Sequence, residues 1–159
     1  MRKYIHYGND HFEPAYFSPI QNVDNWTKPT GGLWASSVDA LFGWKDWCEC
    51  EDYRECDLNK SFTFTLKENA NVIYIHSIDD LKDLPTRNND NPFTTYLDFE
   101  KMVENGIDAI EVFTRDDLLD FMERHVMFGD NVYDTLLYRL HPWDCDSIII
   151  MNPDIIQLE

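Results

Sequence analysis

Three residues of this 159-residue chain could act together on one small bound molecule. They are His6 in the segment YIHYG, Trp34 in GGLWASS and Glu111 in NGIDAIEVF. An imidazole can bind a hydroxyl group, an indole can hold a planar ring, and a carboxylate can stabilise a positive charge that develops during a reaction. Each residue alone has an ordinary explanation, because such side chains usually pack in a core or face solvent. They gain chemistry only if the fold brings them together.

Glu111 lies in an otherwise apolar stretch, residues 107–113. Strand alternation places Ala109 and Glu111 on one face and Ile110 and Val112 on the other. If the first face lines a cleft, Glu111 is a partly desolvated carboxylate with a shifted pKa. The alternative is an edge strand with Glu111 in water.

Short apolar or alternating runs predict the strands that would carry these residues. The expected strands cover residues 2–8, 33–36, 61–66, 71–77, 107–113 and 147–151, with a further strand after a turn at Asn152 and Pro153. Three prolines interrupt residues 9–32, which are expected to form a long connection, and residues 85–95 are expected to form a polar loop.

Helices are expected where an apolar stripe follows a capping residue. One starts at Ser36 or Ser37 and runs toward Trp47, with Val38, Leu41, Phe42 and Trp44 on its apolar side. The others are a short helix capped by Ser77, a helix over residues 96–106 with Leu97, Phe99, Met102 and Val103 inward and Gly106 as its stop, and a helix over residues 114–126 that starts at Thr114.

The order of these elements predicts an α+β fold. Strands and helices do not alternate regularly, and no glycine-rich phosphate loop follows the first strand, as a doubly wound parallel sheet would require. We therefore expect residues 1–159 to form a single domain with a mixed or mainly antiparallel sheet and flanking helices.

Composition limits the partners. Hydrophobic residues make up 43% of the chain, so a core can form, and the net charge is −17 from 13 basic and 30 acidic residues. This charge argues against non-specific nucleic-acid binding and against docking on anionic lipid. It fits a soluble protein that its charge keeps dispersed, or one that approaches a basic partner or mimics nucleic acid. No apolar run reaches the roughly 18 residues of a membrane span and no signal peptide is recognised, so the expected location is the cytoplasm.

Cysteines and histidines offer a metal site as a rival interpretation. Cys48, Cys50 and Cys56 follow a C-x-C-x5-C spacing, and Cys145 is remote, which fits no standard zinc pattern. Reduced, partly buried thiols without bound metal are expected instead. His6 and His11 could serve a metal-dependent hydrolase, although their spacing is not the i, i+4 pair of a helical zinc site.

Taken together, the three segments resemble the ADP-ribosyltransferase superfamily. The order of a histidine in the first strand, an aromatic residue after a glycine-led second strand and a glutamate in a late strand is similar to the diphtheria-toxin-like branch with its His–aromatic–Glu triad. The chain also looks like the small phage-borne members, including anti-CRISPR transferases. YIHYG, GGLWASS and NGIDAIEVF carry the resemblance, with WDCDSIIIMNPDII as a closing strand.

The resemblance implies a split sheet and a transferase that uses NAD as substrate and releases nicotinamide. Glu111 would be catalytic, because it would bond the 2′-hydroxyl of the nicotinamide ribose and stabilise an oxocarbenium-like transition state. His6 would bind a ribose hydroxyl or the adenosine side of NAD. Trp34 would stack against nicotinamide, although the family commonly has tyrosine there.

The rest of the NAD site is implied in the same way. It would comprise Tyr7, Gly8, Gly32, Leu33, Ser36 and Ser37, with the paired glycines giving the backbone room beside the ligand. Ser36 or Ser37 would contact the nicotinamide ribose or simply support the strand. Ala109 stands where some relatives have a second Glu or Gln, so an arginine-modifying specificity is not supported.

The acceptor of the ADP-ribose stays open. A macromolecule is expected, with a protein favoured, but a nucleic-acid base, a small molecule and water remain alternatives. A different class of function also remains, namely a catalytically inactive acidic binding or inhibitor protein on the same fold, such as a phage counter-defence factor.

Overall fold

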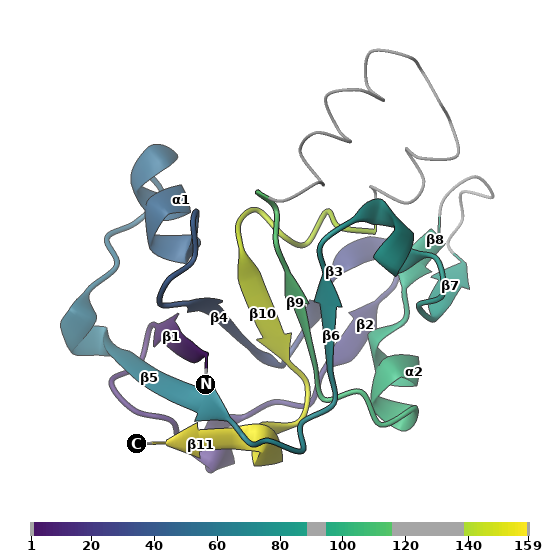
Figure 1. Ribbon diagram of the computed structural model, residues 1–159, viewed down its shortest axis with the longest axis horizontal. Helices are drawn as coiled ribbons and strands as arrows, with labels where there is room; N and C mark the ends of the chain where they lie inside the picture. The colour runs from purple at the N-terminus through teal and green to yellow at the C-terminus, as the bar shows by residue number, and fades with distance from the viewer. Residues whose placement is uncertain (1, 89–94, 116–138, 159) are drawn as a thin grey trace.

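The computed structural model describes residues 2–88, 95–115 and 139–158 of the chain. Within these residues, seven strands form one sheet in the order β11-β5-β1-β4-β10-β9-β6 (Figure 1). The strands are β1 (Lys3–Tyr7), β4 (Leu33–Ser37), β5 (Ser61–Leu66), β6 (Val72–Ile75), β9 (Ala109–Val112), β10 (Ser147–Ile150) and β11 (Ile156–Leu158). In the described sheet β6 and β9 are parallel and the other neighbours are antiparallel. The α+β class with a mixed sheet is therefore confirmed.

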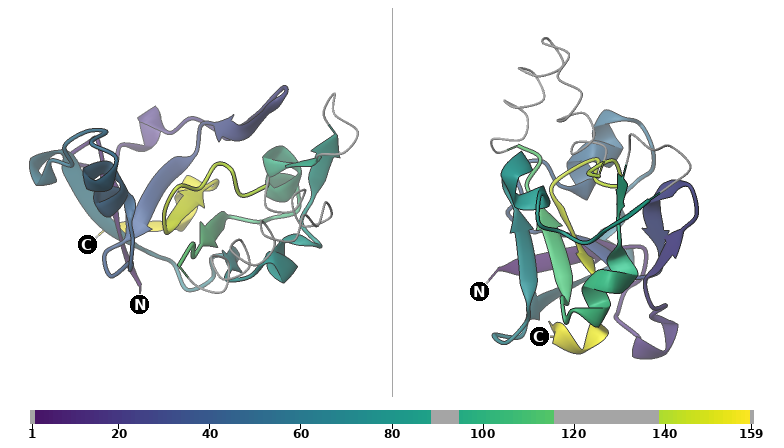
Figure 2. Two further views of the ribbon diagram at one scale, coloured as in Figure 1. Left: turned by 90° about the horizontal axis from the view of Figure 1, so that it is seen from above. Right: turned by 90° about the vertical axis from the view of Figure 1, so that its right-hand side faces the viewer.

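β4 is the strand at which the sheet divides. Its first three residues, Leu33, Trp34 and Ala35, pair with β10, whereas Ser36 and Ser37 pair with β1. The strands β11, β5 and β1 therefore lie on one side of β4, and β10, β9 and β6 lie on the other (Figure 1). Seen from above, the sheet is bent rather than flat (Figure 2).

An apolar cluster covers each face of this sheet. The cluster on one face includes Ile75, Phe99, Met102, Ile110, Trp143 and Ile149. The cluster on the other face includes Tyr4, Phe62, Phe64, Ala109, Ile148 and Ile150. Ile148, Ile149 and Ile150 of β10 alternate between the two clusters, which is why three isoleucines follow one another here instead of an alternating pattern.

The helix expected from Ser36 or Ser37 toward Trp47 starts later in the structure. β4 continues through Ser37, and the helix α1 spans Trp44–Cys50 with Gly43 as its N-cap. The Gly43 N–H donates to the Asp46 carboxylate at 2.8 Å, and the Trp44 N–H donates to Ser36 Oγ at 2.9 Å. Ser36 therefore supports the start of the helix from the neighbouring strand and is not its N-cap. Two of the residues expected on the apolar side are exposed, Val38 at 56% and Leu41 at 80%.

Two stretches expected to be irregular contain strands. The connection 9–32 holds a hairpin of β2 (Gln21–Val23) and β3 (Trp26–Thr30), which reverses at Asn25 with φ 56°. The expected loop 85–95 holds β7 (Thr86–Asn88), which pairs with β8 (Thr95–Leu97). Strands of three to five residues that contain proline or polar side chains give almost no period-two signal, so the sequence did not reveal them.

The remaining helices are short. The helix expected after Ser77 is a 3₁₀ turn, Ile78–Leu81, and further 3₁₀ turns lie at Pro14–Tyr16, Leu58–Lys60 and Pro153–Ile155. The helix expected over residues 96–106 is α2 (Phe99–Glu104), which starts later because β8 takes the first positions and Asp98 forms the N-cap. Val103, expected inward, is 40% exposed.

The helix expected over residues 114–126 lies almost entirely outside the described residues. Among the described helices, none has the length and apolar character to span a membrane.

Candidate functional site

A pocket of about 200 Å³, which we call the main pocket, lies where β4 passes from β10 to β1. Its lining includes His6 and Tyr7 from β1, Lys28 from β3, Trp34 and Ser36 from β4, Trp44 from α1, and Arg54, Asp144 and Cys145 from connecting segments. Four residues expected to bind NAD, namely His6, Tyr7, Trp34 and Ser36, are therefore brought together. The division of the sheet at β4 makes this possible, because it separates β10 from β1 at this end.

His6 is held as a neutral hydrogen-bonding group. Its Nδ1 lies 2.7 Å from the carbonyl oxygen of Trp34, so Nδ1 carries the proton and donates it to that oxygen. Burial lowers the pKa of His6 below its usual value, the bond to Trp34 opposes this, and the charge of Arg54 adds to the lowering. Nε2 is then an unprotonated acceptor at neutral pH, which suits a donor such as a ribose hydroxyl.

Trp34 forms one wall of the main pocket. Its indole packs edge-on against Trp143, with ring centroids 5.4 Å apart and an interplanar angle of 62°. The ammonium of Lys28 lies over the same indole, 5.2 Å from the ring centroid. The tryptophan is thus fixed by the core on one side and covers part of the pocket with its ring on the other.

The two serines after Trp34 have different positions. The buried Ser36 hydroxyl donates to the Asp146 carbonyl at 2.9 Å and accepts from the Trp44 N–H, so it supports the pocket wall. Ser37 is outside the lining of the main pocket, and its hydroxyl contacts the Asp39 carboxylate. Contact with the ribose and support of the strand were the two roles expected for these serines. Both hydroxyls have partners within the protein, which is the supporting role.

Gly32 and Leu33 line a second, smaller pocket of about 110 Å³ with Phe12, Tyr16 and Phe62 among its walls. Gly8 lines neither of the two pockets described. It has φ +135°, and a Cβ at this position would lie 3.5 Å from His6 Nε2. Gly8 therefore leaves space beside the histidine that a side chain would enter.

The paired glycines make room for the protein's own backbone. Gly31 has φ +73°, and a Cβ there would lie 2.1 Å from the carbonyl oxygen of Pro19. Gly32 has φ +67°, and its Cβ would lie 3.0 Å from the carbonyl oxygen of Ile150. The sequence suggested that this pair leaves space beside a ligand. At Gly31 the protein's own backbone occupies that space.

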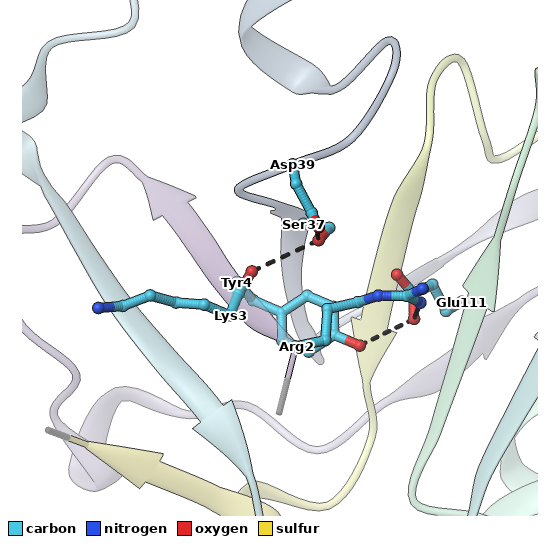
Figure 3. A network of polar contacts seen from close by, with 6 residues as sticks. All are labelled: Arg2, Lys3, Tyr4, Ser37, Asp39 and Glu111. Carbon is cyan, nitrogen blue, oxygen red and sulfur yellow. Dashed lines mark hydrogen bonds and ion pairs between the residues drawn. The ribbon is translucent and has the colours of Figure 1, made fainter.

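Glu111 lies outside the main pocket, in a polar cluster with the exposed Arg2 and the buried Tyr4 (Figure 3). Arg2 Nη1 donates to Glu111 Oε2 at 2.9 Å, and the Tyr4 hydroxyl donates to the same oxygen at 2.8 Å. The residue is 2% exposed, and β9 lies between β10 and β6. The alternative of an edge strand with Glu111 in water is therefore wrong.

Sheet register explains why Glu111 and Trp34 do not meet. Ile148 of β10 pairs with Glu111 on one side and with Ala35 on the other, so these three side chains share a face. Trp34 pairs with Ile149 and points to the opposite face. The indole of Trp34 is therefore apart from Glu111. His6 pairs with Phe62 on the Glu111 face, and it meets Trp34 through its bond to the Trp34 carbonyl and in the lining of the main pocket.

The Glu111 cluster has an expected pH signature. Burial is the largest influence and raises the pKa of Glu111 above 4.5, while the bonds from Tyr4 and Arg2 oppose it. A carboxyl group with a raised folded-state pKa binds more protons in the folded state than in the unfolded state. Its contribution to stability is therefore complete below the unfolded-state pKa and is lost as pH rises through the folded-state pKa.

We expect Glu111→Gln to remove this dependence. As pH falls from neutral toward 4.5, wild-type protein should gain unfolding free energy relative to Glu111→Gln, measured by urea denaturation at several pH values. Glu111→Ala should also cost about 1–3 kcal/mol at every pH, because it leaves the buried Tyr4 hydroxyl without an acceptor. A stability difference between wild type and Glu111→Gln that stays constant with pH would contradict the raised pKa.

Asp144 supplies the carboxylate of the main pocket. It is exposed and lines the pocket with His6 and Trp34, just before β10. The adjacent Cys145 is 2% exposed, and burial raises the pKa of its thiol to about 12, so it is not a thiolate nucleophile at neutral pH. Asp144 is therefore the acidic side chain in the lining of this pocket.

Sequence reasoning missed the three charged residues of the pocket lining, Lys28, Arg54 and Asp144. Asp144 lies in the segment RLHPWDCD, where Pro142 and Trp143 are typical of a packed turn. An acidic residue just before a buried strand was the available signal for Asp144. Lys28 lies in a short hairpin, and Arg54 lies in the segment after a short helix. No pattern in the sequence marks either residue.

The metal interpretation gains no geometric support. Over residues 2–88, 95–115 and 139–158, no three His, Cys, Asp or Glu side chains lie close enough to hold a metal ion. His11 is exposed and contacts its neighbour Asp10 at 2.5 Å, and it lines the smaller pocket whereas His6 lines the main pocket. The four cysteines are thiols, with Cys48 and Cys145 buried, Cys56 half-buried and Cys50 exposed.

Comparisons with known proteins leave the site to be judged by its own geometry. No protein-family model matches the sequence. Neither the curated proteins nor the solved structures give a significant match. The function is accordingly inferred from the main pocket and its residues.

Proposed function

We propose that the protein is an NAD-dependent ADP-ribosyltransferase and that the main pocket holds the nicotinamide ribose end of NAD. One observation carries this proposal: His6, Trp34 and Asp144 line the same pocket. An acceptor nitrogen can bind a ribose hydroxyl, an aromatic wall can hold the nicotinamide ring, and a carboxylate can stabilise the positive charge that develops as the nicotinamide–ribose bond breaks.

Each group has a defined task in the proposed reaction. The bond between the sugar carbon C1′ and the nicotinamide nitrogen breaks, and its electron pair leaves with nicotinamide, which becomes neutral. Positive charge develops on the sugar, where the Asp144 carboxylate stabilises the transition state more than the ground state. Nε2 of His6 accepts from a ribose hydroxyl, and Trp34 holds the planar leaving group. The acceptor then forms the new bond to C1′ and loses a proton to solvent.

The proposal is tested by incubating the purified protein with NAD and measuring released nicotinamide by chromatography. Wild-type protein should release nicotinamide, and NAD should raise its melting temperature because ligand binds the folded state. His6→Ala should weaken NAD binding, since the ribose contact is lost. His76→Ala is a matched control, because His76 is exposed beside Phe113, follows the edge strand β6 and does not line this pocket.

The melting temperature matters because a transferase can be silent without its acceptor. Release of nicotinamide supports the proposal. So does a rise in melting temperature with NAD that is smaller in His6→Ala and unchanged in His76→Ala. Neither release nor a shift at millimolar NAD would contradict it.

A second candidate follows from the surface of α1 and the segment after it. Trp44, Trp47 and Tyr53 contact one another, with ring centroids 4.9 Å apart for the two tryptophans and 5.3 Å for Trp47 and Tyr53. The acidic residues of the same stretch are Asp46, Glu49, Glu51, Asp52, Glu55 and Asp57. An acidic surface with aromatic rings favours a basic protein partner. Salt-sensitive binding to a basic protein, without any effect of NAD on melting, would support this inhibitor function instead.

A further inference from the structure

Two basic side chains reach the main pocket of a strongly acidic chain. Lys28 comes from β3 and Arg54 from the segment after α1, so separate parts of the chain supply them. Basic residues are scarce, with 13 Lys and Arg against 30 Asp and Glu. Elsewhere on the surface, Lys45, Lys82 and Lys101 each pair with a carboxylate three or four residues away.

Lys28 and Arg54 contact aromatic rings instead of carboxylates. Lys28 Nζ lies 5.2 Å from the ring centroid of Trp34, and Arg54 Cζ lies 5.4 Å from that of Trp44. Across the described part of the chain, neither side chain forms an ion pair. A cation over an exposed ring gains only about 0.5–1 kcal/mol, so both cations can leave these rings for an anionic ligand.

The charges of NAD decide which part of it suits these two cations. The nicotinamide ring is cationic until its bond breaks, and Lys28 and Arg54 would repel it. The diphosphate carries two negative charges and accepts charge-assisted hydrogen bonds from both residues.

The size of the main pocket places the diphosphate near both side chains. Its volume of about 200 Å³ is below the roughly 300–1,000 Å³ of sites that enclose whole ligands. The nicotinamide ribose end can occupy it, and the diphosphate must then lie at the rim. Lys28 and Arg54 are both exposed lining residues, so their long side chains can reach that rim.

We propose that Lys28 and Arg54 form an anion site at the rim of the main pocket that binds the diphosphate of a dinucleotide. This inference deepens the proposed function and rests on it for the identity of the dinucleotide. On binding, Lys28 leaves the indole of Trp34 and moves to the diphosphate. The aromatic face is then open to the nicotinamide ring.

The test measures binding of three probes by calorimetry. Inorganic pyrophosphate carries only the anionic group, ADP-ribose carries the diphosphate without nicotinamide, and nicotinamide riboside carries the ring and ribose without phosphate. Lys28→Met and Arg54→Gln should each weaken ADP-ribose and pyrophosphate binding about ten-fold, as expected for a lost charged hydrogen bond. Nicotinamide riboside binding should stay the same or tighten. Lys67→Met is the matched control, since Lys67 is exposed and lines neither pocket.

Each outcome separates this inference from the proposed function. Wild-type protein that binds neither pyrophosphate nor ADP-ribose overturns the anion site. The anion site is also overturned if Lys28→Met and Arg54→Gln bind ADP-ribose as tightly as the wild type does. It is likewise overturned if their affinity for nicotinamide riboside falls as much as their affinity for ADP-ribose. If pyrophosphate binds and both variants lose it, the anion site stands, and absence of nicotinamide release in the same preparation then counts against the transferase alone.

Discussion

Asp144→Asn should lower the rate of nicotinamide release about 10²–10³-fold, which corresponds to roughly 3–4 kcal/mol of transition-state stabilisation. The amide keeps the size of the side chain but removes the negative charge that faces the developing positive charge on the sugar. NAD binding should change little, because the ground state gains less from this carboxylate than the transition state does. Single-turnover rates and the NAD dissociation constant, measured on the same preparation, separate the two effects.

Glu111→Gln is the control that locates the catalytic carboxylate. Glu111 is the residue that the family resemblance selects, but its carboxylate is bonded to Arg2 and Tyr4 and is absent from the main pocket. Glu111→Gln should therefore keep nicotinamide release within a few-fold of wild type. Loss of release in Glu111→Gln together with full release in Asp144→Asn would reverse the assignment and restore the carboxylate chosen from the sequence.

Most strands of the seven-stranded sheet could be predicted because their residues are buried on one or both faces. β5, β6, β9 and β10 lie within or close to the ranges expected from hydrophobic patterning. Local hydrogen bonds set the helix boundaries that differ from those expected from the sequence. The helix after β4 begins at Trp44 because Asp46 and Ser36 satisfy its first N–H groups there, and such contacts depend on the path of the loop before the helix.

The site was only partly predictable, because it depends on which strands become neighbours. Patterning correctly put Glu111 on the opposite face from Ile110, but it could not tell which face carries Trp34. That relation follows from the register of β10 between β4 and β9, which only long-range pairing defines. Asp144 was passed over for the same reason, since its approach to His6 depends on β4 exchanging one neighbour for another.

Gly31→Ala should destabilise the fold by about 2–5 kcal/mol, a large share of the stability of a small domain. Two costs add at this position. The residue has φ +73°, where an L-residue is strained, and a Cβ would lie 2.1 Å from the Pro19 carbonyl oxygen and 2.7 Å from that of Ser18. Backbone atoms cannot rotate aside as a side chain can. The N–H of Gly32 donates to the Ser18 carbonyl at 2.9 Å, so this close approach is held in place.

Gly106→Ala isolates the first of these costs, the backbone strain. Gly106 has φ +76°, close to that of Gly31, but a Cβ there would meet nothing within 4 Å. Its substitution should cost only the backbone strain of about 1–2 kcal/mol. The difference between the two variants in urea denaturation measures the packing of residues 18–19 against the start of β4, and hence how firmly Trp34 is positioned. Equal unfolding free energies for Gly31→Ala and Gly106→Ala would mean that residues 18–19 yield easily and that the glycine pair does not fix the pocket wall.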